Sequence, residues 1–179
     1  MEKENRINGF EKLWAPWRMK YIEGIETEKN SECIFCEKPS EETDKANFIL
    51  YRGKLCFLIL NVFPYNNGHL LIVPYTHTQQ FEELGAETVL EMNEVASIAI
   101  RAIKKTMRPD GFNMGMNLGR SAGAGIAEHI HLHLVPRWNG DTNFMSVIGG
   151  TKVISESLED SYNKIKKAFE ECIGPDNKE

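Results

Sequence analysis

Residues 128–138 read EHIHLHLVPRW, and a histidine occupies every second position from 129 to 133. The whole chain contains five histidines, so most of them fall in this short run: His129, His131 and His133. Because side chains alternate across a β-strand, the pattern predicts a strand with all three imidazoles on one face. The other face carries apolar residues that enter the core: Ile130, Leu132 and Leu134.

Three imidazoles on one strand face indicate a functional site. A merely solvated face needs no histidine, because Ser, Thr or Lys would serve equally well. One zinc ion bound by all three is also disfavoured. Neighbours at i and i+2 lie ~6 to 7 Å apart along a strand, whereas a tetrahedral zinc ion makes bonds of ~2 Å.

Composition and charge narrow the class of protein. The 179 residues are 41% hydrophobic and 26% charged, which is ordinary for one soluble globular domain. The net charge of −5 argues against an electrostatic nucleic-acid partner, although a local site can still bind a small anion. The N-terminal MEKENRING lacks the apolar core of a signal peptide, and no apolar run is long enough to span a membrane. We therefore expect a cytoplasmic protein with no membrane partner.

Periodicity predicts an α+β fold with about five strands, mainly antiparallel because hairpins connect the early ones. The predicted strands are FILYR (48–52), CFLIL (56–60), HLLIVP (69–74), FNMGMN (112–117) and HIHLHLVP (129–136). Apolar residues at three- and four-residue spacing predict a long helix over about 87–106. A second such stripe predicts a C-terminal helix from Leu158 to Cys172.

The pair Cys33 and Cys36 forms a CxxC motif, which is a common zinc half-site. A redox pair would need a thioredoxin-like βαβ context, and none precedes these cysteines. They also suit a purely structural role. Two further zinc ligands would have to come from the histidines, of which His69 and His77 flank one predicted strand. Those two are expected to lie ~20 Å apart, so they cannot both join the site.

The HIHLHLV run resembles the signature of the histidine triad (HIT) superfamily of nucleotide hydrolases and transferases. NVFPYNNGH (61–69) is similar to the family segment that runs from an Asn to a Gly-His pair, and SAGAG (121–125) resembles its phosphate loop. CIFC together with PYTH (74–77) resembles the zinc-bearing bacterial members. The flanks LWAPWRMKYI (13–22) and PRWNGDTNFM (136–145) resemble the diadenosine tetraphosphate phosphorylase subgroup.

The resemblance implies a domain organisation and a zinc site. It implies a HIT-like fold in which 1–179 form a single HIT domain. The core covers about 33–138, with an N-terminal extension at 1–32 and a C-terminal helical segment at 139–179. It also selects four ligands for a structural zinc ion: Cys33, Cys36, His77 and His129.

The chemistry of imidazole makes His131 the candidate nucleophile, as the resemblance also implies. An imidazole is largely neutral near pH 7, so one ring nitrogen can attack a phosphorus while the other is held by a hydrogen bond. His133 is expected to hydrogen-bond the phosphate or leaving-group oxygens, and His69 to supply a further donor. His69 also suits the end of a strand at the surface.

The resemblance further implies a set of nucleotide-binding residues. The small residues of the loop let backbone N–H groups approach phosphate, and the Asn at 61 would bind ribose hydroxyls. Ile34 and Phe35 match an apolar base pocket, although both also suit a core. The full set is Ile34, Phe35, Asn61, Asn117, Gly123, Ala124, Gly125, Ile126 and His133.

Three functions remain open from the sequence. The first is nucleotidyl transfer from a dinucleoside polyphosphate through a nucleotidyl-histidine, with phosphate or water as acceptor. The second is hydrolysis of nucleoside phosphoramidates, and the third is a nucleotide-binding partner protein without catalysis. Superfamily transferases such as the hexose-phosphate uridylyltransferases carry Gln at the third histidine, so His133 favours hydrolysis, whereas the flanking resemblance favours phosphorolysis. A homodimer is expected from the resemblance alone.

Overall fold

The structure, a computed structural model, describes residues 6–7, 10–11, 33–143, 148 and 153–173. The chain divides into two compact units, Met1–Ser31 and Glu32–Glu179. In the first unit, β1 (Arg6–Ile7) and β2 (Phe10–Glu11) pair in an antiparallel hairpin. The whole LWAPWRMKYI flank (13–22) lies outside the described residues. Because the two units are described separately, the assignment of 1–179 to one HIT domain stays a prediction.

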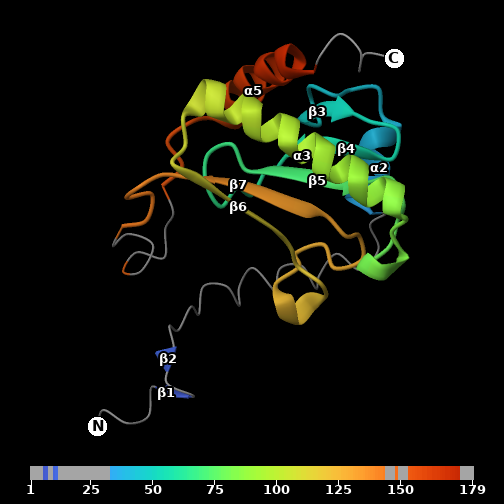
Figure 1. Ribbon diagram of the computed structural model, residues 1–179, viewed down its shortest axis with the longest axis horizontal. Helices are drawn as coiled ribbons and strands as arrows, with labels where there is room; N and C mark the ends of the chain where they lie inside the picture. The colour runs from blue at the N-terminus through green and yellow to red at the C-terminus, as the bar shows by residue number, and fades with distance from the viewer. Residues whose placement is uncertain (1–5, 8–9, 12–32, 144–147, 149–152, 174–179) are drawn as a thin grey trace. The chain divides into compact units, whose positions relative to one another are not determined.

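The second unit contains a five-stranded sheet in the order β3-β4-β5-β7-β6, and every neighbouring pair is antiparallel (Figure 1). This confirms the predicted α+β class and its mainly antiparallel sheet. The strands are β3 (Ile49–Arg52), β4 (Cys56–Leu60), β5 (Leu70–Pro74), β6 (Gly111–Met116) and β7 (Leu132–Arg137).

Two helices cover one face of this sheet. The amphipathic sequence over 86–107 forms the long helix α3 (Ala86–Met107), and the C-terminal stripe forms α5 (Leu158–Cys172), whose N-cap Ser157 accepts a hydrogen bond from the Asp160 N–H. The two helices lie side by side in Figure 1. Short 3-10 turns, η1 (Phe81–Glu83) and η2 (Arg120–Ala122), lie between the longer elements. No helix in the described ranges is long and apolar enough to cross a membrane.

A third helix, α2 (Ile34–Ser40), was not predicted, because seven residues with an internal proline are too few to show a helical period. It follows directly after Cys33 and carries Cys36. Its buried residue Phe35 is only 3% exposed and packs into an apolar cluster on the sheet. The CxxC motif therefore lies at the start of a helix that Phe35 anchors to the sheet.

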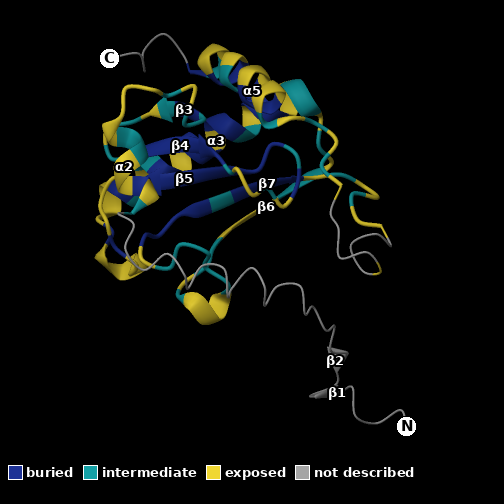
Figure 2. Cartoon of the chain, turned by 180° about the vertical axis from the view of Figure 1, so that it is seen from behind, coloured by how far each residue is buried: buried dark blue, intermediate teal, exposed yellow. Residues whose placement is uncertain are grey.

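The apolar residues of the sheet alternate between two clusters. The larger cluster joins the sheet to α3 and α5, and it contains Ile130, Leu132 and Leu134, as predicted. The smaller cluster lies on the other face with Phe35: Ile49, Phe57, Ile59, Leu71 and Val73. All of β4 and β5 is buried, as Figure 2 shows in dark blue. The histidine face of β7 is therefore the face that α2 covers.

One expectation about the strands needs correction. The strand predicted over 129–136 begins only at Leu132, so His129 and His131 precede it. The backbone there still runs beside the chain that follows β5, because the Ile130 N–H donates to the Thr78 carbonyl (2.7 Å). Met114 on the edge strand β6 is 52% exposed.

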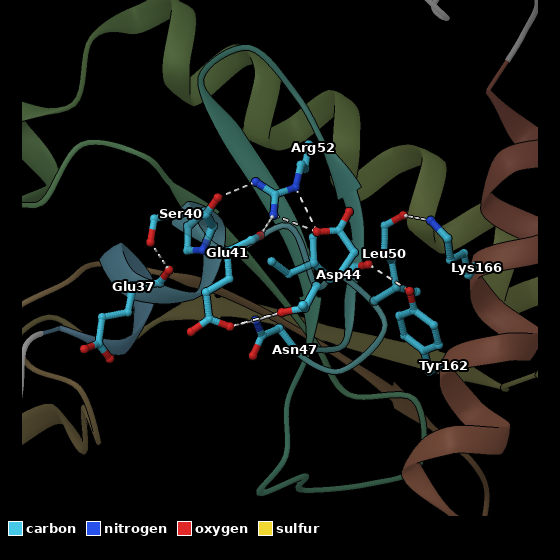
Figure 3. Close-up of polar contacts among 12 residues, drawn as sticks. Glu37, Ser40, Glu41, Asp44, Asn47, Leu50, Arg52, Tyr162 and Lys166 are labelled. Carbon is cyan, nitrogen blue, oxygen red and sulfur yellow. Dashed lines mark hydrogen bonds and ion pairs between the residues drawn. The ribbon is translucent and has the colours of Figure 1, made fainter.

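Arg52 at the end of β3 ties the segment after α2 to the sheet (Figure 3). Its guanidinium donates to two carbonyl oxygens, those of Pro39 and Glu41 (2.9 Å for Glu41), and to the carboxylate of Asp44 (2.9 Å from Nε). The planar fork of donors suits such a set of acceptors, whereas the single ammonium of a lysine does not. Arg52 thus fixes where α2 ends.

Replacing Arg52 by Ala is expected to lower the free energy of unfolding by about 1 to 2 kcal/mol, because two carbonyl groups lose a charged donor. The ion pair with Asp44 adds little, since both side chains are about a third exposed. Denaturant unfolding measures the change. Arg101→Ala on α3 is the matched control, because Arg101 is exposed and, among the described residues, donates to Ser97 Oγ alone (3.3 Å). Equal effects from both variants would contradict an anchoring role.

Candidate functional site

Four aromatic rings form a row across the site at the start of β7. Ring centroids lie 5.1 Å apart from Phe35 to His131, 4.8 Å from His131 to His133, and 5.6 Å from His133 to Tyr65. His69 lies beside the row, with its ring 5.1 Å from that of His133. The structure thus brings the three predicted catalytic histidines together.

His131 is held by one hydrogen bond that fixes its proton. Its Nδ1 lies 2.8 Å from the backbone carbonyl of His129. A carbonyl only accepts, so Nδ1 carries the hydrogen and Nε2 keeps its lone pair. The residue is 6% exposed, and burial lowers the pKa of its imidazole. His131 is therefore neutral at neutral pH and presents the lone pair of Nε2.

A chain of hydrogen bonds fixes the proton on His133 as well. The backbone N–H of Tyr65 donates to His69 Nδ1 (3.0 Å), so that nitrogen is an acceptor. His69 Nε2 must then carry the hydrogen, which it donates to His133 Nδ1 (2.9 Å). His133 Nε2 in turn carries the remaining hydrogen, and this buried atom has no partner in the described part of the chain. It is a donor ready for a phosphate oxygen.

Both members of this pair are neutral. Burial lowers the pKa of His69 to about 3 and that of His133 to about 4, with smaller contributions from the neighbouring histidines. Neutral imidazoles are what the hydrogen-bond chain requires, because a protonated His69 could not accept at Nδ1.

The loop from Asn61 to His69 has polar contacts that hold it in place. Asn61 Oδ1 accepts from the Phe63 N–H (3.0 Å), and its Nδ2 lies 3.2 Å from His69 Nδ1. The predicted ribose-binding amide is thus already engaged within its own loop. Gly68 has φ +69°, a left-handed conformation that favours glycine directly before His69.

Asn66 anchors the same loop and was missed by the sequence reasoning. Its Nδ2 donates to the Pro136 carbonyl (3.1 Å) and to Asp141 Oδ2 (2.8 Å), and Arg137 binds the same carboxylate. The pKa of Asp141 is held well below its usual range by the hydrogen bonds from Arg137. No local pattern signals this role, because the partners lie about 70 residues apart in sequence.

The predicted phosphate loop (121–125) overlaps the end of η2 and contains the glycine that follows it, Gly123. Asn117 Nδ2 donates to the Gly123 carbonyl (3.4 Å), so the predicted amide does contact the loop. Ile126 packs against the Phe35 cluster, whereas Ile34 is 39% exposed and lies outside it. The loop residues Gly123, Ala124 and Gly125 are half-buried.

A compact cluster of sulfur and nitrogen atoms lies beside the histidine row: Cys33, Cys36, His77 and His129. Their potential ligand atoms all lie within 4.8 Å of one another. His129 Nε2 donates to the Pro74 carbonyl (2.9 Å), which leaves Nδ1 as an acceptor 3.3 Å from Cys33 Sγ. Two thiols and two imidazoles are a common donor set of a closed tetrahedral zinc site.

Trp138 follows β7 and lies at the end of α3. Its indole N–H donates to the Met107 carbonyl (3.3 Å) at the end of α3. It also lines a cavity of about 520 Å³ together with residues of α5. Tyr65 is an exposed aromatic residue that lies beside His69 and His133. Sequence reasoning missed it because a loop tyrosine shows no periodicity.

Comparison with known proteins agrees with this geometry. The model of the HIT domain matches residues 42–140. The chain belongs to the HIT family. That family comprises nucleotide hydrolases and transferases, and the chain is an enzyme of this kind.

Individual relatives differ in how much of the chain they match. An AP-4-A phosphorylase of Mycobacterium tuberculosis is 43% identical over 157 residues, covering 84% of this chain and 80% of the relative. A Zn-bound histidine triad family protein from Mycobacterium smegmatis superimposes with a TM-score of 0.64 at 30% identity, covering 78% of this chain and 94% of that one. An adenylylsulfatase of Arabidopsis thaliana is 33% identical over 111 residues, covering 62% of this chain and 55% of its own length.

Replacing His69 by Gln is expected to flatten the dependence of stability on pH. In the native protein the pKa of His69 is about 3, whereas an unfolded histidine titrates near 6.5. The unfolded state therefore binds more protons between these values, and native stability falls as pH falls through them. Without His69, the slope between pH 4.5 and 5.5 is expected to drop by about one proton, or about 1.4 kcal/mol per pH unit.

Denaturant unfolding at several pH values measures this slope for both proteins. NMR titration of the imidazole resonances gives an independent check, because His69 is expected to stay neutral down to about pH 4. An unchanged slope in the variant, or a His69 resonance that titrates near 6.5, would show that the imidazole is not held neutral.

Proposed function

We propose that this enzyme transfers the nucleotidyl group of a dinucleoside polyphosphate such as diadenosine tetraphosphate, with His131 as the covalent carrier. One observation carries the proposal: His131 Nε2 holds a lone pair next to His133 Nε2, which holds a hydrogen. A nucleophile and a phosphate donor thus stand side by side, both neutral. The similarity to an AP-4-A phosphorylase supports the same substrate class.

In the proposed first step, His131 Nε2 bonds to the α-phosphorus, and the bond from that phosphorus to its bridging oxygen breaks. ATP leaves with the electron pair, and AMP remains on His131. His133 Nε2–H hydrogen-bonds a phosphate oxygen during this step. In the second step an acceptor attacks the same phosphorus and releases His131. Inorganic phosphate yields ADP, and water yields AMP.

We propose phosphate as the acceptor, because the relative named as a phosphorylase matches 84% of this chain. Phosphorolysis and hydrolysis differ only in which molecule attacks the phosphorus after ATP has left. Both reactions would use the same row of histidines, so the acceptor has to be identified from the reaction products.

A second candidate is hydrolysis of a nucleoside phosphoramidate or another adenosine monophosphate adduct. The similarity to an adenylylsulfatase favours it, because that name describes a substrate without a second nucleoside. His131 would attack the same α-phosphorus, and only the leaving group would differ.

Separate incubations with diadenosine tetraphosphate and with a nucleoside phosphoramidate test the two proposals. ATP and ADP are expected, and only when inorganic phosphate is present. ATP and AMP formed without phosphate would replace phosphorolysis by hydrolysis. Turnover of a phosphoramidate but not of the tetraphosphate would favour the second candidate. The variant His131→Asn is expected to lose at least about 1000-fold in kcat, because it lacks the nucleophile.

We further propose that Cys33, Cys36, His77 and His129 hold a structural zinc ion. The donor set and its mutual distances fit zinc, and the similarity to a Zn-bound family protein supports the metal. When bound, the ion would fix His129 relative to α2. His129 also supplies the carbonyl that accepts from His131 Nδ1. The proposed metal site would thereby help to hold the nucleophile, with no step of the reaction taking place on the metal.

Purified protein is expected to contain about one zinc ion per chain. Cys36→Ser is expected to lose most of this zinc and to melt at a lower temperature, because binding to the native state alone adds stability. Cys172→Ser is the matched control, since Cys172 at the end of α5 lies outside the cluster. Metal analysis and thermal unfolding provide the two readouts. Equal zinc contents in both variants would argue against these ligands.

We also propose that the protein forms a homodimer. The edge strand β6 supports it, because Asn113, Met114 and Gly115 are exposed and an edge strand offers free backbone groups for pairing. The cytoplasmic location and the lack of a nucleic-acid partner stay predictions from the sequence.

A further inference from the structure

Tyr65 is the one member of the aromatic row that reaches well into solvent. Its side chain is 52% exposed, whereas Phe35 at the other end of the row is 3% exposed. Tyr65 stacks on His133 with an angle of 19° between the ring planes and a centroid distance of 5.6 Å. The exposed face of this ring offers a surface on which a planar base can stack.

The position of Tyr65 is fixed, although it lies on a loop. Its backbone N–H donates to His69 Nδ1, and its ring also contacts that of His69 at 4.6 Å. The following residue, Asn66, is bound to the Pro136 carbonyl and to Asp141. The ring is therefore presented by an ordered backbone, so little conformational entropy is lost when something stacks on it.

The order of the rings suggests what stacks there. The reacting phosphate belongs at the centre, between His131 and His133. Phe35 lies on one side of this pair and Tyr65 on the other. A dinucleoside polyphosphate has the same arrangement, with phosphates in the middle and a base at each end. Phe35 is the buried end of the row of rings, and Tyr65 is its exposed end. The second base would therefore lie on the side of Tyr65.

We propose that Tyr65 is the stacking platform for the second base of the dinucleoside polyphosphate, the base that departs with the leaving group. This inference rests on the proposed function for the identity of the substrate. It adds a specificity residue: the site prefers a substrate with two nucleosides over a mononucleotide with the same number of phosphates. The ring and not the hydroxyl carries the effect, because stacking needs only a π-face.

Two probes isolate the second base. Diadenosine tetraphosphate and adenosine 5′-tetraphosphate share one adenosine and four phosphates, and only the former has a second nucleoside. Binding of each is measured by calorimetry in full-length protein carrying His131→Asn, which prevents turnover. Tyr65→Ala in this background is expected to weaken binding of diadenosine tetraphosphate about tenfold. Binding of adenosine tetraphosphate is expected to stay within about twofold.

Control variants separate stacking from support of the histidines. Tyr65→Phe is expected to bind both probes like the parent, and Tyr65→Leu to behave like Tyr65→Ala. Every one of these residues keeps the backbone N–H that fixes His69. Phe81→Ala removes another exposed aromatic ring, from η1, and is expected to change neither affinity.

Equal weakening of both probes by Tyr65→Ala would overturn the proposal and assign Tyr65 to supporting His133. Unchanged affinity for both would overturn it as well. Failure of the proposed function gives a different result. In that case protein with an intact His131 turns over neither a dinucleoside polyphosphate nor a phosphoramidate. The role of Tyr65 is still decided by how Tyr65→Ala changes the affinities for the two probes.

Discussion

Three backbone groups determine which nitrogen carries the proton in four of the histidines. The His129 carbonyl orients His131, the Tyr65 N–H orients His69 and through it His133, and the Pro74 carbonyl orients His129. Backbone groups are either donors or acceptors and cannot exchange these roles, unlike hydroxyls or amides. Each imidazole therefore presents one defined atom: a lone pair on His131 and a hydrogen on His133.

The same bonds connect the catalytic row to the cysteine cluster. His129 contributes its ring to that cluster and its carbonyl to His131. Phe35, which lies between the two cysteines in sequence, contacts the rings of both histidines at 5.5 and 5.1 Å. A change in the position of α2 would thus reach His131 by two routes, one polar and one apolar. This explains why a helix of seven residues needs Arg52 at its far end.

The sequence predicted the parts of this site that depend on alternation and spacing. Ile130, Leu132 and Leu134 enter the main core, and the four predicted zinc ligands do lie together. Alternation has a short range, so it gave the faces of β7 correctly but placed its start three residues too early. Tyr65 and Asn66 were missed because their roles come from residues on β7 and beyond. Such long-range contacts leave no local pattern in either segment.

Burial and substrate act on the histidines in opposite directions. In the structure, burial lowers the pKa of His133 to about 4, so the ring is neutral and needs no counter-ion. A polyphosphate placed next to Nε2 adds negative charge within a few ångströms, and such charge favours the protonated imidazole. Protonation of His133 would, however, put a hydrogen on Nδ1, which accepts from His69 Nε2 in the structure. The hydrogen bond from His69 therefore opposes a positive charge on His133, so the proposed polyphosphate substrate would meet a neutral Nε2–H donor.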